Sequence, residues 1–167
     1  MKYTSSEAAK LLRKLNEEHD TLEAAEQSAG TFIVASGEDV ESLRPEYDYN
    51  ETQKKLDEIE KKIVTVKHAL NIFNSTKKLP GYDITADQAL IIMPQLTKRK
   101  DRLDTMRRRL PKTRETGIRS GNIIDYCLTN YDPKQAQADF EKASDELAKL
   151  QTALDLFNTT ETLEIDI

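Results

Sequence analysis

The residues best suited to binding chemistry form a basic segment at positions 98–119. It holds ten cationic side chains against three acidic ones, a net charge of +7, while the rest of the 167-residue chain carries −12. Cations gathered in this way can neutralise phosphates, and such binding weakens as salt rises. The segment therefore indicates a possible RNA- or DNA-binding face, made of Lys98, Lys100, Arg102, Arg107, Arg108, Arg109, Lys112, Arg114 and Arg119.

An acidic segment offers a second interpretation of the same cations. Residues 17–27 contain five acidic side chains and no Lys or Arg, and they occupy the equivalent place in an internal repeat of the chain. Opposite charges on equivalent helices indicate that the helices face each other, within one chain or between subunits. We favour this charge pairing, and with it self-association, over nucleic-acid binding.

Glu18 and Arg99 form the most specific candidate pair. Each interrupts a heptad series of apolar residues, and the repeat places them at equivalent positions. A charge buried alone costs several kcal/mol, so a partner is required. We therefore expect a possible core ion pair between Glu18 and Arg99.

Catalytic, metal and cofactor sites are not expected. The two histidines, His19 and His68, lie 49 residues apart, and neither completes the Glu-x-x-His pattern of a di-iron bundle. Cys127 is the only cysteine and sits in an apolar, β-prone run, which predicts a buried, inert thiol. Gly-rich phosphate loops and hydrolase motifs are missing from the sequence. The chain is therefore interpreted as a non-enzyme without metal or cofactor.

The elements that must position these residues belong to a segment that occurs twice in the sequence. Six apolar positions from Leu56 to Phe73 recur 84 residues later, from Phe140 to Phe157, with the same 3-4 spacing. The pairs Tyr47/Tyr131 and Gln53/Gln137 share that offset, and the earlier part of each half aligns at an offset of 81. We infer a duplication with repeats at 1–82 and 83–167, within a single domain.

Each repeat predicts a helix, a long connection and a second helix. The helices are expected at 5–28, 49–75, 86–110 and 133–159, each starting at capping-box spacing. Pro94 predicts a kink in the third helix. The fold class is mainly α: an antiparallel four-helix bundle from a duplicated helical hairpin, with a small β element at one end.

The β element is expected in the connections within each repeat, at 29–47 and 111–131. Residues 31–35 and 123–128 are β-prone and flanked by glycines, so they predict two strands that pair as a small capping sheet. An apolar plug is the alternative. Each repeat then closes on Phe-Asn-Ser/Thr-Thr, at 73–76 and 157–160, which indicates a helix stop or two equivalent binding sites.

Three stretches of the chain resemble a known group of proteins. These are Ala-Leu-Asn-Ile-Phe-Asn-Ser-Thr at 69–76, Gly-Tyr-Asp-Ile-Thr-Ala-Asp-Gln-Ala-Leu at 81–90, and the Arg-rich helix that follows. They resemble small, uncharacterised bacterial helical proteins sometimes labelled septicolysin-like. The resemblance implies a helical fold and brings no catalytic residues. The label would imply a membrane-active toxin, for which this chain lacks an apolar amphipathic segment.

Composition supports a cytoplasmic assembly protein. The chain is 37% apolar and 33% charged, without tryptophan, which suits long helices that bury one narrow stripe. It shows neither a membrane span nor a signal peptide. We expect a homo-oligomer with no small-molecule substrate and no membrane partner.

Overall fold

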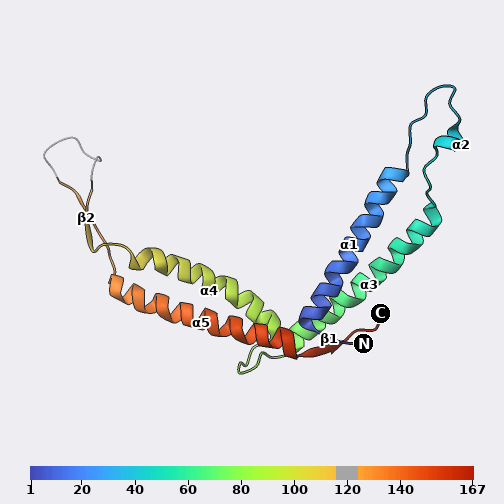
Figure 1. Cartoon of the computed structure of the whole chain (residues 1–167). Coiled ribbons are helices and arrows are strands. Elements are labelled where there is room, and N and C mark those ends of the chain that lie inside the picture. Colours follow the sequence, from blue (N-terminus) through green and yellow to red (C-terminus); the bar gives the residue numbers. More distant parts are fainter. Residues whose placement is uncertain (116–123) are drawn as a thin grey trace. The chain divides into compact units, whose positions relative to one another are not determined.

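The computed structural model describes residues 1–115 and 124–167, and its fold is mainly α. Four long helices pack in pairs, α1 with α3 and α4 with α5, and two small two-stranded sheets accompany them (Figure 1). The contacts divide the chain into two compact units. One comprises residues 1–76 with 157–167, and the other comprises residues 77–156.

The first unit is a hairpin of α1 (Ser5–Ala29) and α3 (Tyr49–Thr76), with the short α2 (Val40–Leu43) in its connection. The helices run antiparallel, because Glu26 contacts Gln53 near the connection while His19 contacts Glu60 further along. A narrow apolar stripe holds them together, with Ala8 and Leu15 buried on α1 and Leu56, Ile59, Val66 and Phe73 buried on α3. This is the stripe that the 3-4 spacing predicted.

The base of this unit is closed by the first and last strands. β1 (Lys2–Thr4) pairs antiparallel with β4 (Thr162–Glu164), with Tyr3 opposite Leu163. The end of α5 also belongs here: the rings of Phe157 and Phe73, which are equivalent in the repeat, lie 5.0 Å apart between centroids. Phe157 is fully buried.

The second unit is the matching hairpin of α4 (Ala86–Arg107) and α5 (Pro133–Thr160). Its stripe consists of Ala86, Ala89, Leu96 and Leu103 on α4 and Ala136, Ala143, Leu150 and Leu154 on α5. Arg107 contacts Gln137 beside the connection, which sets the antiparallel register. The connection carries β2 (Lys112–Arg114) and β3 (Tyr126–Leu128), which pair antiparallel.

Local capping explains where the helices begin. Thr4 and Thr85 each accept a hydrogen bond from the backbone of the residue three positions on, whose side chain returns to the cap backbone. Asp48 accepts from the backbone N–H of Glu51, and Asp132 from that of Lys134. The predicted helix starts are therefore confirmed, because these side chains satisfy backbone donors that the first turn leaves free.

The segment before α4 repeats the arrangement before α1. Lys78 forms a bridge with Thr85, just as Thr162 pairs with Thr4 in β1 and β4. A tight turn lies between the two bridge partners, where Gly81 adopts a φ of +78° and Tyr82 donates its backbone N–H to the carbonyl of Leu79. Glycine enters this left-handed region without the steric cost that a side chain brings. The duplication thus extends from the sequence to the hydrogen bonds.

The predicted pairing of 31–35 with 123–128 is wrong. Residues 31–35, all of which the structure describes, form no strand, and Ile33 is 98% exposed. β3 instead pairs with β2 in its own connection, while residue 123 lies outside the described residues. A partner nearby in sequence wins because closing a short loop costs less entropy than recruiting a distant segment.

Three smaller predictions also need correction. Cys127 is exposed rather than buried, because the two-stranded sheet of β2 and β3 is exposed at every residue of both strands. The third helix ends at Arg107 instead of 110, consistent with the bias against helix at Leu110, the residue before Pro111. Asn74 and Asn158 do not end their helices in a left-handed conformation: no described non-glycine residue has a positive φ.

Candidate functional site

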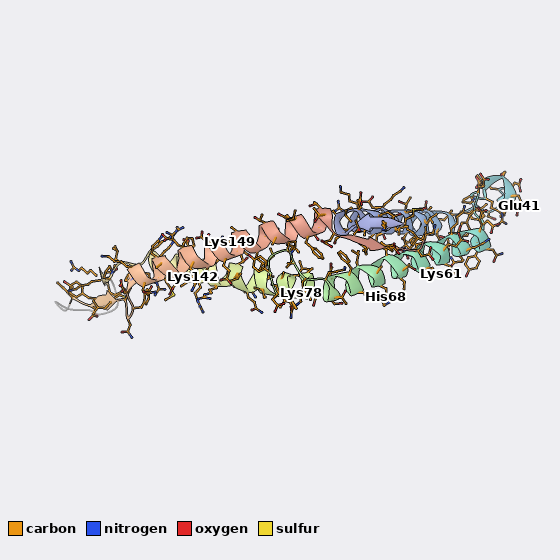
Figure 2. The ribbon with its side chains drawn as sticks, turned by 90° about the horizontal axis from the view of Figure 1, so that it is seen from below. Glu41, Lys61, His68, Lys78, Lys142 and Lys149 are labelled. Atoms are coloured by element: carbon orange, nitrogen blue, oxygen red, sulfur yellow. The ribbon has the colours of Figure 1, made fainter. Side chains whose placement is uncertain are left out.

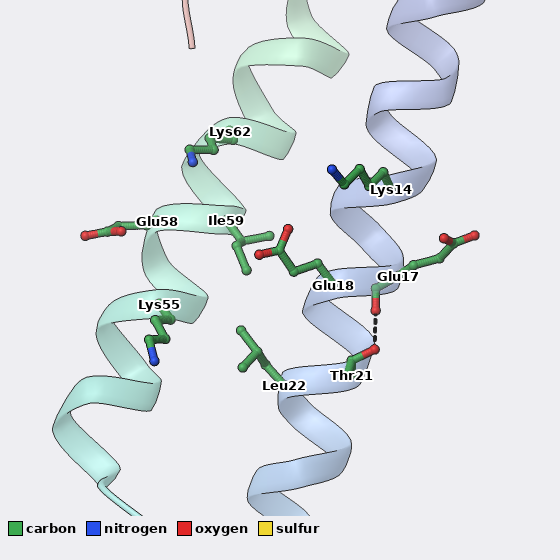
Figure 3. A pocket seen from close by; sticks show the side chains of 9 residues that line it. All are labelled: Lys14, Glu17, Glu18, Thr21, Leu22, Lys55, Glu58, Ile59 and Lys62. Carbon is green, nitrogen blue, oxygen red and sulfur yellow. Dashed lines mark hydrogen bonds between the residues drawn. The ribbon is translucent and has the colours of Figure 1, made fainter.

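A groove runs along the α1·α3 hairpin of the first unit. Its volume is about 740 Å³, with Leu22 and Ile59 at its base and charged side chains around them (Figure 3). The lining residues are Lys14, Glu17, Glu18, Thr21 and Leu22 from α1, and Lys55, Glu58, Ile59 and Lys62 from α3. They include no histidine and no cysteine, so the groove offers charge and a small apolar floor.

Glu18 lies in this groove and is exposed, as is Arg99 on α4 of the other hairpin. Neither side chain is therefore buried, contrary to the expectation that both occupy core positions. A long side chain at the edge of the stripe can keep its charged end in water. The ion pair between Glu18 and Arg99 would join the two units, and it stays a prediction.

A polar cluster holds the far end of the first hairpin together. Tyr47 donates its hydroxyl hydrogen to Glu26 Oε1 over 2.6 Å, and Gln53 donates from Nε2 to the same oxygen over 2.7 Å. The hydrogen bond to the Glu26 carboxylate, helped by burial, raises the pKa of Tyr47 to about 12. The cluster fastens the connection to both helices, and it was not predicted from the sequence.

The second hairpin has the same cluster with the opposite charge. Arg107, the repeat equivalent of Glu26, donates from Nη1 to Gln137 Oε1 over 2.9 Å. Its guanidinium carbon lies 4.1 Å from the centroid of the Phe140 ring, and Tyr131 donates to the carbonyl of Met106. Gln53 thus presents its amide N–H₂ to an anion while Gln137 presents its carbonyl oxygen to a cation. The offset of 81 relates Glu26 to Arg107 and would have revealed this exchange.

Part of the predicted basic face is occupied by contacts within the hairpin. Asp104 forms ion pairs with Arg107 at 2.6 Å and Arg108 at 2.7 Å. The hydrogen bond from Arg107 lowers the pKa of Asp104. Lys112 Nζ lies 4.0 Å from the centroid of the Tyr126 ring. These three cations therefore stabilise the end of the hairpin as well as charging it.

The remaining cations are free of ion pairs within the described parts of the chain. Lys98, Arg99, Arg102 and Arg109 are exposed, Lys100 is half-buried, and Arg114 is exposed in β2. Helical spacing puts Lys98 and Arg102 off the buried stripe of Leu96 and Leu103, on one flank of α4. Arg119 lies outside the described residues. The basic face is thus narrower than the sequence indicated and centres on the middle of α4.

His19, Asp20 and Glu23 form the one group that the described residues offer to a metal ion. One potential ligand atom from each lies within 4.8 Å of the others, and the opposite ring nitrogen of His19 lies 3.3 Å from Glu60 Oε1. All three residues come from one helical turn, and Asp20 is 79% exposed. His68 is exposed on α3 (Figure 2). Within the described residues, no helix has the length and apolar character to cross a membrane.

Comparison with known proteins identifies the fold. No protein-family model matches the chain, and no curated protein does. A crystal structure of a functionally unknown conserved protein from Corynebacterium diphtheriae is similar, with a TM-score of 0.62 and 16% sequence identity. The match covers 98% of this chain and 100% of that chain. At this identity the likeness concerns the fold alone.

Proposed function

We propose that this protein is a non-enzymatic helical assembly protein that associates with further copies of itself through helix faces of opposite charge. The observation that supports the proposal is the charge difference between equivalent parts of the repeat. Residues 17–48 hold ten acids and one base, a net −9, whereas the equivalent residues 98–132 hold ten bases and five acids, a net +5. Separate surfaces of opposite charge steer association and select the partner.

Exposure makes these charges available to a partner. Glu17 and Glu18 in the groove and Lys98 on α4 are exposed, so none of them is needed to cover the apolar stripe of its own hairpin. The connections also present apolar side chains to solvent, with Ile33 in the first and Leu128 in the second. Charge for selection and apolar area for affinity are the two components of a protein interface.

Light scattering after size exclusion tests the proposal directly. We expect a discrete oligomer at about 0.1 M salt that dissociates toward about 1 M, where the screening length falls from about 10 Å to about 3 Å. Circular dichroism at both salt concentrations controls for unfolding. A monomer at every protein and salt concentration would contradict the proposed function.

Nucleic-acid binding is the second candidate, and the unpaired cations of α4 favour it. The Lys98→Glu, Arg102→Glu variant should then lose retention on heparin and affinity for labelled RNA, with its helicity unchanged. Self-association predicts instead that this variant alters the oligomer. Because both residues are exposed and lie off the buried stripe of α4, neither outcome should be confused with loss of folding.

A further inference from the structure

The residues that line the groove of the α1·α3 hairpin have repeat equivalents on the α4·α5 hairpin. The offsets of 81 and 84 carry these residues onto nine positions of the second hairpin. We call these nine the counterpart face, and they are Gln95, Lys98, Arg99, Arg102 and Leu103 on α4 and Asp139, Lys142, Ala143 and Glu146 on α5. The apolar floor persists, since Leu22 becomes Leu103 and Ile59 becomes Ala143.

The charges on the two faces are opposite at every position where both are charged. On α1, Glu17 and Glu18 become Lys98 and Arg99. On α3, Lys55, Glu58 and Lys62 become Asp139, Lys142 and Glu146. At the two remaining polar positions, Lys14 becomes Gln95 and Thr21 becomes Arg102, so the second face loses one cation and gains another.

Folding of either hairpin does not require this reversal. The five groove residues whose charge is reversed in the repeat are all exposed, and four of their five counterparts are exposed as well. Exposed positions tolerate either sign, since a surface ion pair contributes at most about 1 kcal/mol. A face that must bind its own counterpart does require opposite signs, because like charges brought together oppose association.

We infer that the groove face of one copy binds the counterpart face of a second copy, with α1 opposite α4 and α3 opposite α5. This rests on the proposed self-association and names its surface. The acidic pair of α1 then meets the cations of α4. The plus-minus-plus order of α3 meets the minus-plus-minus order of α5, which is complementary whichever way the helices run. The exchanged pairing, α1 with α5 and α3 with α4, would bring Glu17 and Glu18 near the two acids of α5 and would bring Lys55 and Lys62 near the cations of α4.

Two charge-reversal variants test the contact. The first carries Glu17→Lys and Glu18→Lys, which makes both faces basic along α1 and α4. The second carries Lys98→Glu and Arg99→Glu, which makes both acidic. We expect each variant alone to dissociate, with a Kd about a hundredfold higher than that of the unchanged protein, as measured by sedimentation. An equimolar mixture of the two should recover the unchanged Kd, because each supplies the face that the other lacks.

Matched controls separate this contact from general charge effects. A variant with Asp57→Lys and Asp145→Lys changes the net charge as the first variant does, but neither residue lines either face. Its Kd should stay within about threefold of the unchanged value, as expected for charges remote from the contact. Circular dichroism should give the same helicity for all variants.

The outcomes separate this inference from the proposed function. If the unchanged protein is monomeric, self-association itself is wrong. If it associates and both reversal variants do so equally well, self-association stands and this surface is wrong. A third variant combines all four changes, which restores opposite signs on the two faces of each chain. If this variant regains the unchanged Kd but the mixture does not, the faces pair within one chain, which overturns the contact with a second copy.

Discussion

The two helical hairpins have the same buried stripe and opposite surface charge. Leu15 and Leu96 occupy equivalent buried positions, whereas Glu26 and Arg107 occupy equivalent positions in clusters of opposite sign. The difference shows which part of the duplicated sequence is constrained by folding. Both repeats must keep the apolar stripe because it holds each helix pair together. The charges of the polar face can change without loss of that packing, and they can therefore be selected for binding to a partner.

The largest loss should follow removal of the aromatic contact at the base of the first unit. Phe157 is fully buried against Phe73, so Phe157→Ala should lower the free energy of unfolding by about 3–5 kcal/mol. Urea denaturation measures it. Phe140→Ala is the comparison, because that ring is half-buried beneath Arg107 and its loss should be smaller. Equal losses would mean that the contact at the base has no special weight.

The common plan can be tested by one substitution in each hairpin. Leu15→Ala and Leu96→Ala remove equivalent side chains that are 6% and 7% exposed, and each should cost about 2–3 kcal/mol. Amide hydrogen exchange should show the loss mainly in α1 and α3 for the first variant and in α4 and α5 for the second. Strongly unequal losses would show that the hairpins differ in packing as well as charge.

Exchanging the charge at the polar clusters should be asymmetric. Glu26→Arg should lower the stability by only about 0.5–1 kcal/mol: Tyr47 loses its acceptor, but Gln53 can turn its amide and Glu23 lies where Asp104 lies beside Arg107. Arg107→Glu should cost about 1–2 kcal/mol, because it places a second acid beside Asp104 and removes the cation over Phe140. Thermal unfolding of both variants measures the difference, and equal effects would contradict it.

The smallest effect concerns Tyr47 at high pH. Its pKa is raised to about 12 by Glu26, so folding favours the neutral phenol. The resulting stability is fully present below the unfolded pKa of about 10 and is lost as the pH rises toward 12. Ultraviolet titration should show one late-ionising tyrosine, which Tyr47→Phe abolishes. A tyrosine titration unchanged by that substitution would contradict the assignment.

The sequence predicted the helices well because their signals are local. The repeated spacing from Leu56 to Phe73, and the caps at Thr4 and Thr85, depend only on neighbours within a turn or two. The strands were harder, because a strand exists only with a partner. Residues 31–35 have the composition of a strand but do not form one. Lys112–Arg114, in contrast, were predicted only as part of a basic segment, and they form β2.

The sequence predicted the sign of the charge on the candidate surface but not the position of that surface. The acidic and basic segments were visible as runs of charge, yet which cations remain free depends on side-chain contacts such as those of Asp104. The groove also needs Lys55, Glu58 and Lys62 from α3. The charges of this helix nearly balance, so its composition alone does not indicate a charged surface. Only the antiparallel register brings these three residues beside Glu17 and Glu18.

The pairing of β1 with β4 has a mechanical consequence. Met1 and Ile165 exchange two backbone hydrogen bonds at the outer end of this antiparallel pair, so tension applied to these two residues loads the ladder from that end. Residue pairs then separate one after another, Lys2 from Glu164 before Thr4 from Thr162, rather than all together. A pulling experiment should therefore find that this short sheet peels apart at low force while the helices behind it remain intact.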